Sequence, residues 1–167
     1  MANEGMSLSD RGYADLRLSE GVRMEYYNDQ ANHCTFGVGT LVHHGPCTAE
    51  EMQQSVTPEM VNTALSQRVH VAEAAVRAGV PDVQLTQAQF DSLVSFVYNV
   101  GARGARAALE AANGGNPSDV ASHMQANVFV RPRDAQGRRG APRRLQGLVN
   151  RRQREAAPFL QQTRPTR

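Results

Sequence analysis

Three side chains near the start of the chain have the types and the spacing for acid-catalysed hydrolysis. Glu20 comes first, Asp29 follows nine residues later, and Thr35 follows six residues after that. Two carboxyl groups that are presented by different elements can hold different protonation states, because each has its own surroundings. General acid catalysis at a glycosidic oxygen needs such a pair, with one protonated acid facing one ionised partner.

The residues before Glu20 have the pattern of a helix. We expect this helix over residues 8–19, with Ser7 or Ser9 as its N-cap. One face of the helix would carry Tyr13, Leu16 and Glu20. Burial at such a helix end favours the neutral form of a carboxyl group, which a general acid requires. Taken alone, Glu20 fits a surface residue near a helix end equally well.

Asp29 and Thr35 lie in a segment that mixes turn residues with short extended stretches. The pattern between residues 22 and 45 predicts a β-hairpin, with Asp29 in a turn and Thr35 opening the stretch Thr-Phe-Gly-Val-Gly. Each residue also has an ordinary explanation, because Asp favours turns and Thr favours strands. Gly37 and Gly39 indicate a close approach of backbone or substrate, and a bulge would explain them equally well.

The spacing Glu-x8-Asp-x5-Thr, followed by Phe-Gly-Val-Gly, resembles the phage-type lysozymes, which are endolysins of glycoside hydrolase family 24. Two further blocks resemble the central and C-terminal helices of that family and stand in the same order, namely residues 85–101 and 147–155. The resemblance implies an α+β, mainly α, two-lobed lysozyme-like fold. A small N-terminal β-hairpin lobe and a helical C-terminal lobe would be joined by a long helix. The chain departs from the family in having Thr40 directly after Gly39, where many members carry His.

The resemblance implies a muramidase that hydrolyses the β-1,4 bond between N-acetylmuramic acid and N-acetylglucosamine in peptidoglycan, and so lyses bacteria. Glu20 would protonate the leaving oxygen, Asp29 would stabilise the developing positive charge and help to activate or place water, and Thr35 would hydrogen-bond that water. The family resemblance favours inversion, which needs carboxyl groups about 6.5–9.5 Å apart. Implied substrate contacts come from Leu41, Tyr98, Asn99, Arg143 and Arg144. No metal and no cofactor is implied.

Size and composition predict one soluble domain over residues 1–167, because 40% of the residues are hydrophobic and 20% are charged. We expect lobes at 1–57 and 81–160, a linking helix at 58–80 and a frayed tail at 161–167. We see no apolar run that could span a bilayer and no signal-peptide pattern. We therefore expect a monomer that is made in the host cytoplasm and acts on the cell wall after release.

The formal net charge of +2 conceals a division along the chain. Residues 1–130 contain 7 Arg and 14 acidic residues, a balance of −7, whereas residues 131–167 contain 11 Arg and 2 acidic residues, a balance of +9. A basic segment suits anionic partners, so we expect an anionic envelope surface as a second partner besides the glycan strands. A solvated helix face explains the same charges equally well.

Two alternative functions use the same features. Nucleic-acid binding through the Arg-rich segment is one, although no nucleic-acid partner is expected. A catalytically silent glycan-binding module of the same fold is the other, and the presence of Glu20, Asp29 and Thr35 argues against it.

The two cysteines, Cys34 and Cys47, flank the expected hairpin. Two are too few for a disulfide scaffold or a structural zinc site. Their position makes cross-strand proximity conceivable, but we expect free thiols, because the protein would be made in the cytoplasm. We give neither cysteine a catalytic role.

Helical patterns and capping residues predict the rest of the chain. We expect helices over residues 48–55, 58–79, 86–101, 104–112, 117–125 and 143–157. The second of these has one apolar stripe, formed by Val61, Leu65, Val69, Ala72 and Val76. Pro158 would stop the last helix, on which Arg151 and Arg152 are expected to be structural.

Overall fold

The computed structural model describes residues 1–134 and 136–161, and this part of the chain is mainly helical with two small antiparallel sheets. Its α-helices are α1 (Asp10–Glu20), α2 (Pro58–Gly79), α3 (Gln87–Asn113), α4 (Pro117–Ala126) and α5 (Gln146–Leu160). Its strands are β1 (Arg23–Asn28), β2 (Cys34–Gly37), β3 (Thr40–His43), β4 (Phe129–Val130) and β5 (Arg143–Arg144). The expected α+β, mainly α class is confirmed. Of the expected frayed tail, residues 162–167 lie outside the described residues.

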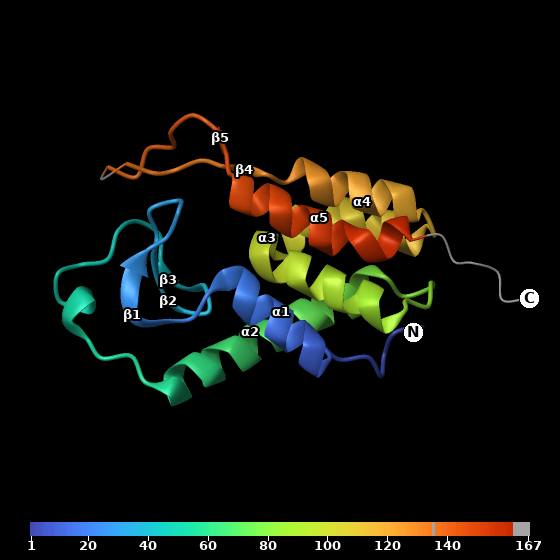
Figure 1. Cartoon of the computed structure of the whole chain (residues 1–167), viewed down its shortest axis with the longest axis horizontal. Coiled ribbons are helices and arrows are strands. Elements are labelled where there is room, and N and C mark those ends of the chain that lie inside the picture. Colours follow the sequence, from blue (N-terminus) through green and yellow to red (C-terminus); the bar gives the residue numbers. More distant parts are fainter. Residues whose placement is uncertain (135, 162–167) are drawn as a thin grey trace, which may run out of the picture. The chain divides into compact units, whose positions relative to one another are not determined.

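The chain divides into two compact units whose elements are labelled in Figure 1. One unit consists of residues 1–13, residues 69–128 and the C-terminal segment from Gln146. The other consists of residues 14–68 and 129–145. Helices α1 and α2 each contribute residues to both units. The expected single lysozyme domain, with its lobe boundaries, stays a prediction.

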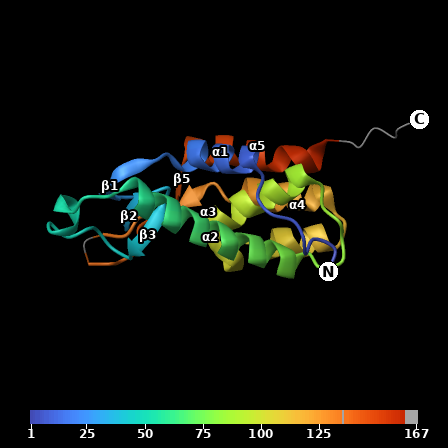
Figure 2. The ribbon, with the colours of Figure 1, turned by 90° about the horizontal axis from the view of Figure 1, so that it is seen from below.

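The first unit is built on α3, α4 and α5, which pack against one another (Figures 1 and 2). The start of α3 has the predicted capping box, in which Thr86 Oγ1 accepts from Gln89 N at 3.2 Å and Gln89 Oε1 accepts from Thr86 N at 3.0 Å. Gly101 has φ +76° inside α3, so the helix is kinked at its predicted end. The apolar core of this unit includes Phe90, Leu93, Val94, Phe96 and Met124.

Helix α5 carries a buried ionic cluster. Arg151 Nε lies 2.8 Å from Glu155 Oε1, and Arg152 pairs with Glu155 Oε2. Ser95 Oγ donates to Glu155 Oε1 at 2.6 Å, so the buried carboxylate is fully engaged. The expected structural role of Arg151 and Arg152 is confirmed, because both side chains are buried in this cluster.

Several sequence-based boundaries are wrong. The first helix begins at Asp10 rather than at residue 8, and the helices expected over 86–101 and 104–112 are joined in α3. The last helix begins at Gln146 rather than at residue 143, because Arg143 and Arg144 pair with the strand β4. It also continues past Pro158 to Leu160, since a proline in the last turn removes only one backbone hydrogen bond. The expected helix over 48–55 is reduced to a 3₁₀ turn, η1 (Glu51–Gln53), although its capping box with Thr48 is formed.

The second unit holds a three-stranded antiparallel sheet in the order β1-β2-β3, one strand more than the expected hairpin. Thr35 pairs with Tyr27 on β1 and with Leu41 on β3. Gly37 sits against α2, where an added Cβ would lie 3.2 Å from the Val61 side chain. The predicted apolar stripe of α2 is confirmed, because all five of its residues are buried.

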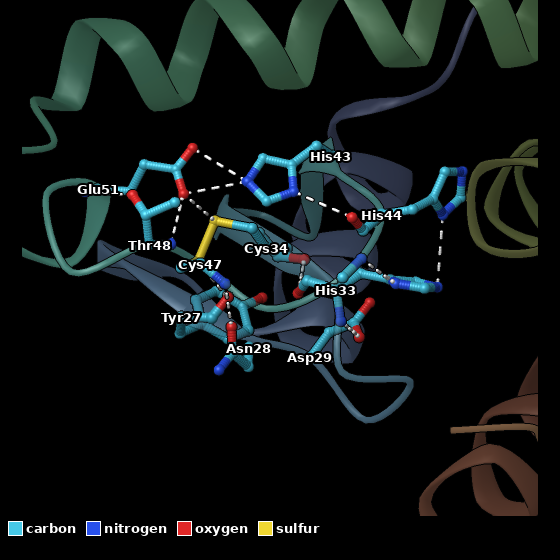
Figure 3. Close-up of a disulfide and its surroundings, with 12 residues drawn as sticks. Tyr27, Asn28, Asp29, His33, Cys34, His43, His44, Cys47, Thr48 and Glu51 are labelled. Atoms are coloured by element: carbon cyan, nitrogen blue, oxygen red, sulfur yellow. Dashed lines mark hydrogen bonds and ion pairs between the residues drawn. A yellow bond between two sulfur atoms is a disulfide. The ribbon is translucent and has the colours of Figure 1, made fainter. Parts of the chain in front are cut away.

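Cys34 and Cys47 form a disulfide (Figure 3), so the expectation of free thiols is wrong. The sheet brings the two residues together, because Cys34 pairs with Asn28 in the ladder while Cys47 N donates to Asn28 Oδ1 at 2.7 Å. Their Cα atoms are 4.5 Å apart, within the range of disulfides. We had expected thiols from the cellular compartment, but the strand register places the two cysteines close enough to bond.

The described helices include none that is both long enough and apolar enough to cross a membrane.

Candidate active site

Glu20 is the last residue of α1, and its side chain is half-buried. Gly21 closes the helix with φ +70° and donates from its N–H to Arg17 O at 2.8 Å. The carboxyl group lies against Gly39 in the turn between β2 and β3, where an added Cβ would stand 2.7 Å from Glu20 Oε2. The close approach that the sequence indicated at Gly39 is therefore made by the Glu20 side chain.

Asp29 holds the turn between β1 and β2. Its Oδ1 accepts two backbone N–H groups, from Ala31 and from His33, each at 2.9 Å. Its own N–H donates to His33 O at 2.9 Å, and Asn32 completes the turn with φ +61°. Asp29 therefore stabilises the turn through its side chain, as Asp residues commonly do. The same hydrogen bonds fix the direction of its carboxyl group.

Thr35 lies in β2 and is 2% exposed. Its Oγ1 donates to His33 O at 3.1 Å, so the oxygen lone pairs remain able to accept. His33 thus binds both Asp29 and Thr35 through its backbone, which ties the turn carboxylate and the strand hydroxyl into one local framework.

The Tyr27 phenol is influenced by the charges of both carboxyl groups. Burial raises the pKa of the Tyr27 phenol, and the negative charges of Glu20 and Asp29 raise it further, against the lowering effects of Arg23 and Arg68. Arg23 also lies over the ring, with Cζ 4.4 Å from its centroid. Both carboxyl groups are therefore within electrostatic reach of one phenol, although they come from a helix end and from a turn.

Arg68 supports the turn that receives Glu20. Its Nη1 donates to the carbonyl oxygen of Gly39 and, at 3.4 Å, to that of Val38. The positive charge of this guanidinium group reaches the Tyr27 phenol, as the charges of the two carboxyl groups do.

Three of the predicted substrate contacts belong to the same unit. Leu41 is 44% exposed on β3, where it pairs with Thr35. Arg143 and Arg144 are exposed on β5. Whether any of the three touches substrate stays a prediction.

The other two predicted contacts belong to the helical unit. Tyr98 is 5% exposed on α3 and forms part of the core. The neighbouring Asn99 accepts a hydrogen bond from Arg152 through its Oδ1. A packing role for Tyr98 and a sugar-binding role therefore both remain, and substrate contact by these residues stays a prediction.

The profile of the family described as phage lysozyme matches residues 17–155, a range that includes Glu20, Asp29 and Thr35. The chain belongs to the phage lysozyme family. The endolysin of Bacillus phage PZA is 32% identical over 158 residues, which cover 92% of this chain and 55% of that protein. The endolysin of Salmonella phage P22 is 31% identical over 98 residues, which cover 58% of this chain and 64% of that protein. The chain thus spans about half the length of the PZA endolysin and about two thirds of the P22 endolysin.

Solved structures of phage lysozymes have the same fold. The endolysin from Escherichia coli O157:H7 phage FAHEc1 aligns with TM-score 0.73 and 30% identity, covering 97% of this chain and 98% of that one. A mutant of P22 lysozyme aligns with TM-score 0.65 and 26% identity, covering 93% and 99% of the two chains. The lysozyme-like fold expected from the sequence is confirmed.

Sequence reasoning missed Tyr27 and Arg68 in this chain. Tyr27 stands in an ordinary strand pattern, and only the register that places it opposite Thr35 singles it out. Arg68 precedes Val69 of the apolar stripe and looks like any charged residue beside a buried helix face. No local signal in the sequence marks either residue, because both gain their place from contacts between elements.

Proposed function

We propose that this phage lysozyme is a peptidoglycan hydrolase that cleaves the β-1,4 bond between N-acetylmuramic acid and N-acetylglucosamine and so causes bacterial lysis. Membership of the family supports the glycosidase activity and the substrate class. The observation that carries the proposal is the match of the family profile to residues 17–155, a range that contains Glu20, Asp29 and Thr35 in the unit that holds the sheet. Hydrolysis of a glycosidic bond needs two carboxyl groups in different roles on two sides of the bond.

In the proposed mechanism Glu20 is the general acid that protonates the leaving oxygen. Its half-buried position at a helix end limits access of water to the carboxyl group. Asp29 supplies negative charge to the oxocarbenium-like transition state and takes the proton of the attacking water as general base. Its two backbone N–H donors keep the carboxylate in place without reorganisation. Thr35 accepts a hydrogen bond from the attacking water, because its own proton is given to His33 O.

The bond that is cut is identified by the new reducing end. Purified peptidoglycan is digested, the products are reduced with borohydride, and the terminal sugar alcohol is identified by mass spectrometry. We expect N-acetylmuramitol. N-acetylglucosaminitol, or release of peptides without any new reducing sugar, would overturn the proposed specificity.

The stereochemical outcome tests the roles of the carboxyl groups. NMR of the first products, recorded before they mutarotate, is expected to show inversion, with water attacking from the side opposite the leaving group. Retention would instead make Asp29 a nucleophile and would remove the proposed role of Thr35.

We also propose that exposed arginines assist binding to the anionic envelope. Residues 131–145 of the strand-forming unit carry exposed guanidinium groups at Arg138, Arg139, Arg143 and Arg144. Reversing the charge of Arg138 and Arg139 is expected to lower lysis most at low salt, where screening is weakest. Equal activity of this variant and the parent at every ionic strength would contradict the assistance but not the hydrolase activity.

A further inference from the structure

A cluster of metal-ligating side chains surrounds the disulfide (Figure 3). His43 Nε2 lies 3.0 Å from each carboxylate oxygen of Glu51, and Glu51 Oε2 lies 3.7 Å from Cys34 Sγ. The ligand atoms of these three residues all lie within 4.8 Å of one another. Cys47 belongs to the same cluster, because its sulfur is bonded to that of Cys34. Strands β2 and β3, the loop after them and η1 thus direct four side chains to one point.

Hydrogen bonds hold two side chains of the cluster in place. His43 Nδ1 lies 3.1 Å from His44 O, so an Nδ1–H donor to this carbonyl fixes the ring and leaves Nε2 facing the cluster. Histidines that bind metals commonly donate their other ring N–H to a backbone carbonyl in this way. Glu51 is held as well, because its Oε2 accepts from Thr48 N at 2.7 Å.

We propose that reduction of the Cys34–Cys47 disulfide converts this cluster into a zinc(II) site, with both thiolates, His43 Nε2 and one Glu51 oxygen as ligands. Two sulfurs, one imidazole and one carboxylate suit the borderline-soft Zn²⁺ ion in tetrahedral coordination. The intact disulfide offers no thiolate, and so the oxidised protein lacks half of the ligand set.

The sheet keeps the ligands together when the sulfur–sulfur bond is broken. Cys34 is paired with Asn28 and with His43 in the two ladders, and its N–H donates to Gly45 O at 2.8 Å. Two thiolates on one tetrahedral zinc ion stand about 3.8 Å apart, given Zn–S bonds of about 2.3 Å. The sulfurs reach that separation by side-chain rotation, because the Cα atoms already lie 4.5 Å apart.

The chemistry balances with a dithiol as reductant. The dithiol gives two electrons and two protons to the protein disulfide and becomes a cyclic disulfide, which leaves two cysteine thiols. Each thiol then releases its proton to the solvent as its thiolate–zinc bond forms, and His43 releases the Nε2 proton that it shares with Glu51, because imidazole binds zinc in its neutral form. The same loop, from Cys34 to Cys47, would therefore be cross-linked by a disulfide under oxidising conditions and by a zinc ion under reducing conditions. Thr35 directly follows the first of these two cysteines.

Cobalt(II) provides a spectroscopic probe of the site. The full chain is reduced with a phosphine, freed of reductant and titrated with Co²⁺ under argon. We expect one Co²⁺ per chain, with thiolate-to-cobalt charge-transfer absorption and the intense d–d bands of a tetrahedral ion, and we expect Zn²⁺ to displace it. The untreated protein is expected to show neither band. Bands of equal strength in the untreated protein, or none in the reduced protein, would overturn the proposal.

Matched variants locate the ligands. We expect His43→Ala to weaken Co²⁺ binding at least tenfold, and Cys34→Ser with Cys47→Ser to abolish the charge-transfer band. His44→Ala is the control, because His44 contributes its backbone carbonyl and keeps it in the variant. Zn²⁺ should also raise the unfolding midpoint of the reduced parent but not of the oxidised parent. Equal binding by the parent and His43→Ala, or failure of Zn²⁺ to restore a reduced protein that has unfolded, would refute the site.

Discussion

Replacing Gly39 by alanine tests whether the carboxyl group of Glu20 must stand where the structure has it. The new Cβ would lie 2.7 Å from Glu20 Oε2, whereas ordinary contacts begin at 3.4 Å. The carboxyl group must therefore retreat by about 0.7 Å, from 2.7 Å to at least 3.4 Å. A misplacement on the order of 1 Å can cost about 10²-fold in rate. We expect kcat/KM on purified peptidoglycan to fall by about 10- to 100-fold.

The same substitution also strains the backbone, so the control must carry the same strain. Gly39 has φ +63° and Gly137 has φ +75°, and nothing lies within 4 Å of a Cβ added at Gly137. An alanine in this left-handed region costs roughly 1–2 kcal/mol at either position. Gly137→Ala should therefore lose similar stability in urea unfolding while it keeps its activity. Activity of Gly39→Ala within about threefold of Gly137→Ala would refute the reasoning, since 0.7 Å would then not matter.

Three further predictions concern stability. Replacing Cys34 and Cys47 together by serine should lower the free energy of unfolding by about 2–3 kcal/mol in urea titrations, because the disulfide closes a loop with a sequence separation of 13. The hydrogen bond to Glu51 raises the pKa of His43, whereas bonds from Thr48 N and His43 lower the pKa of Glu51. Their pairing therefore stabilises the fold fully between about pH 4.5 and 6.5, and this contribution is lost as the pH rises through the raised pKa of His43 or falls through the lowered pKa of Glu51. The stability difference between the parent and His43→Ala, measured in urea, should be larger at pH 5.5 than at pH 8. Glu155→Gln should cost about 3–5 kcal/mol, because it leaves two buried arginines without their counter-charge.

Each of these predictions has a control or a contradicting result. Glu110→Gln removes an exposed pair with Arg106 at 3.9 Å and should change stability by less than about 0.5 kcal/mol. Equal losses for Glu110→Gln and Glu155→Gln would mean that burial of the α5 cluster is unimportant. A pH-independent effect of His43→Ala would show that the ring acts by packing alone. Unchanged stability of the serine double variant would show that the sheet holds the loop without the disulfide.

Local patterns predicted the helices well. The capping box at Thr86, the stripe of α2 and the break at Gly101 follow from residues within one or two turns of each other, and the structure has all three. The start of α5 was misplaced because Arg is a good helix former. In the structure Arg143 and Arg144 instead pair with residues 129–130 as a strand. Such pairing between distant residues leaves no periodic signal.

In the candidate site, too, local sequence patterns were informative and contacts between distant residues were not. Glu20, Asp29 and Thr35 could be proposed from the sequence because their spacing along the chain is short and matches a family pattern, and their catalytic roles stay a prediction. The contributions of Tyr27 and Arg68 were not found, since they depend on the register of β1 against β2 and on which carbonyl groups α2 faces. The sequence left cross-strand proximity of the cysteines open but did not predict the disulfide, because a sequence separation of 13 says nothing about a Cα distance of 4.5 Å.

The central claim is that Glu20 is the acid that makes glycan cleavage fast. Release of reducing sugar from purified peptidoglycan should be measured for the parent, for Glu20→Gln and for Glu25→Gln, a variant with the same chemical change on the exposed end of β1. The account predicts a fall of about 10²- to 10⁴-fold for Glu20→Gln, with unchanged unfolding behaviour, and full activity for Glu25→Gln. Parent-like rates for Glu20→Gln would contradict it.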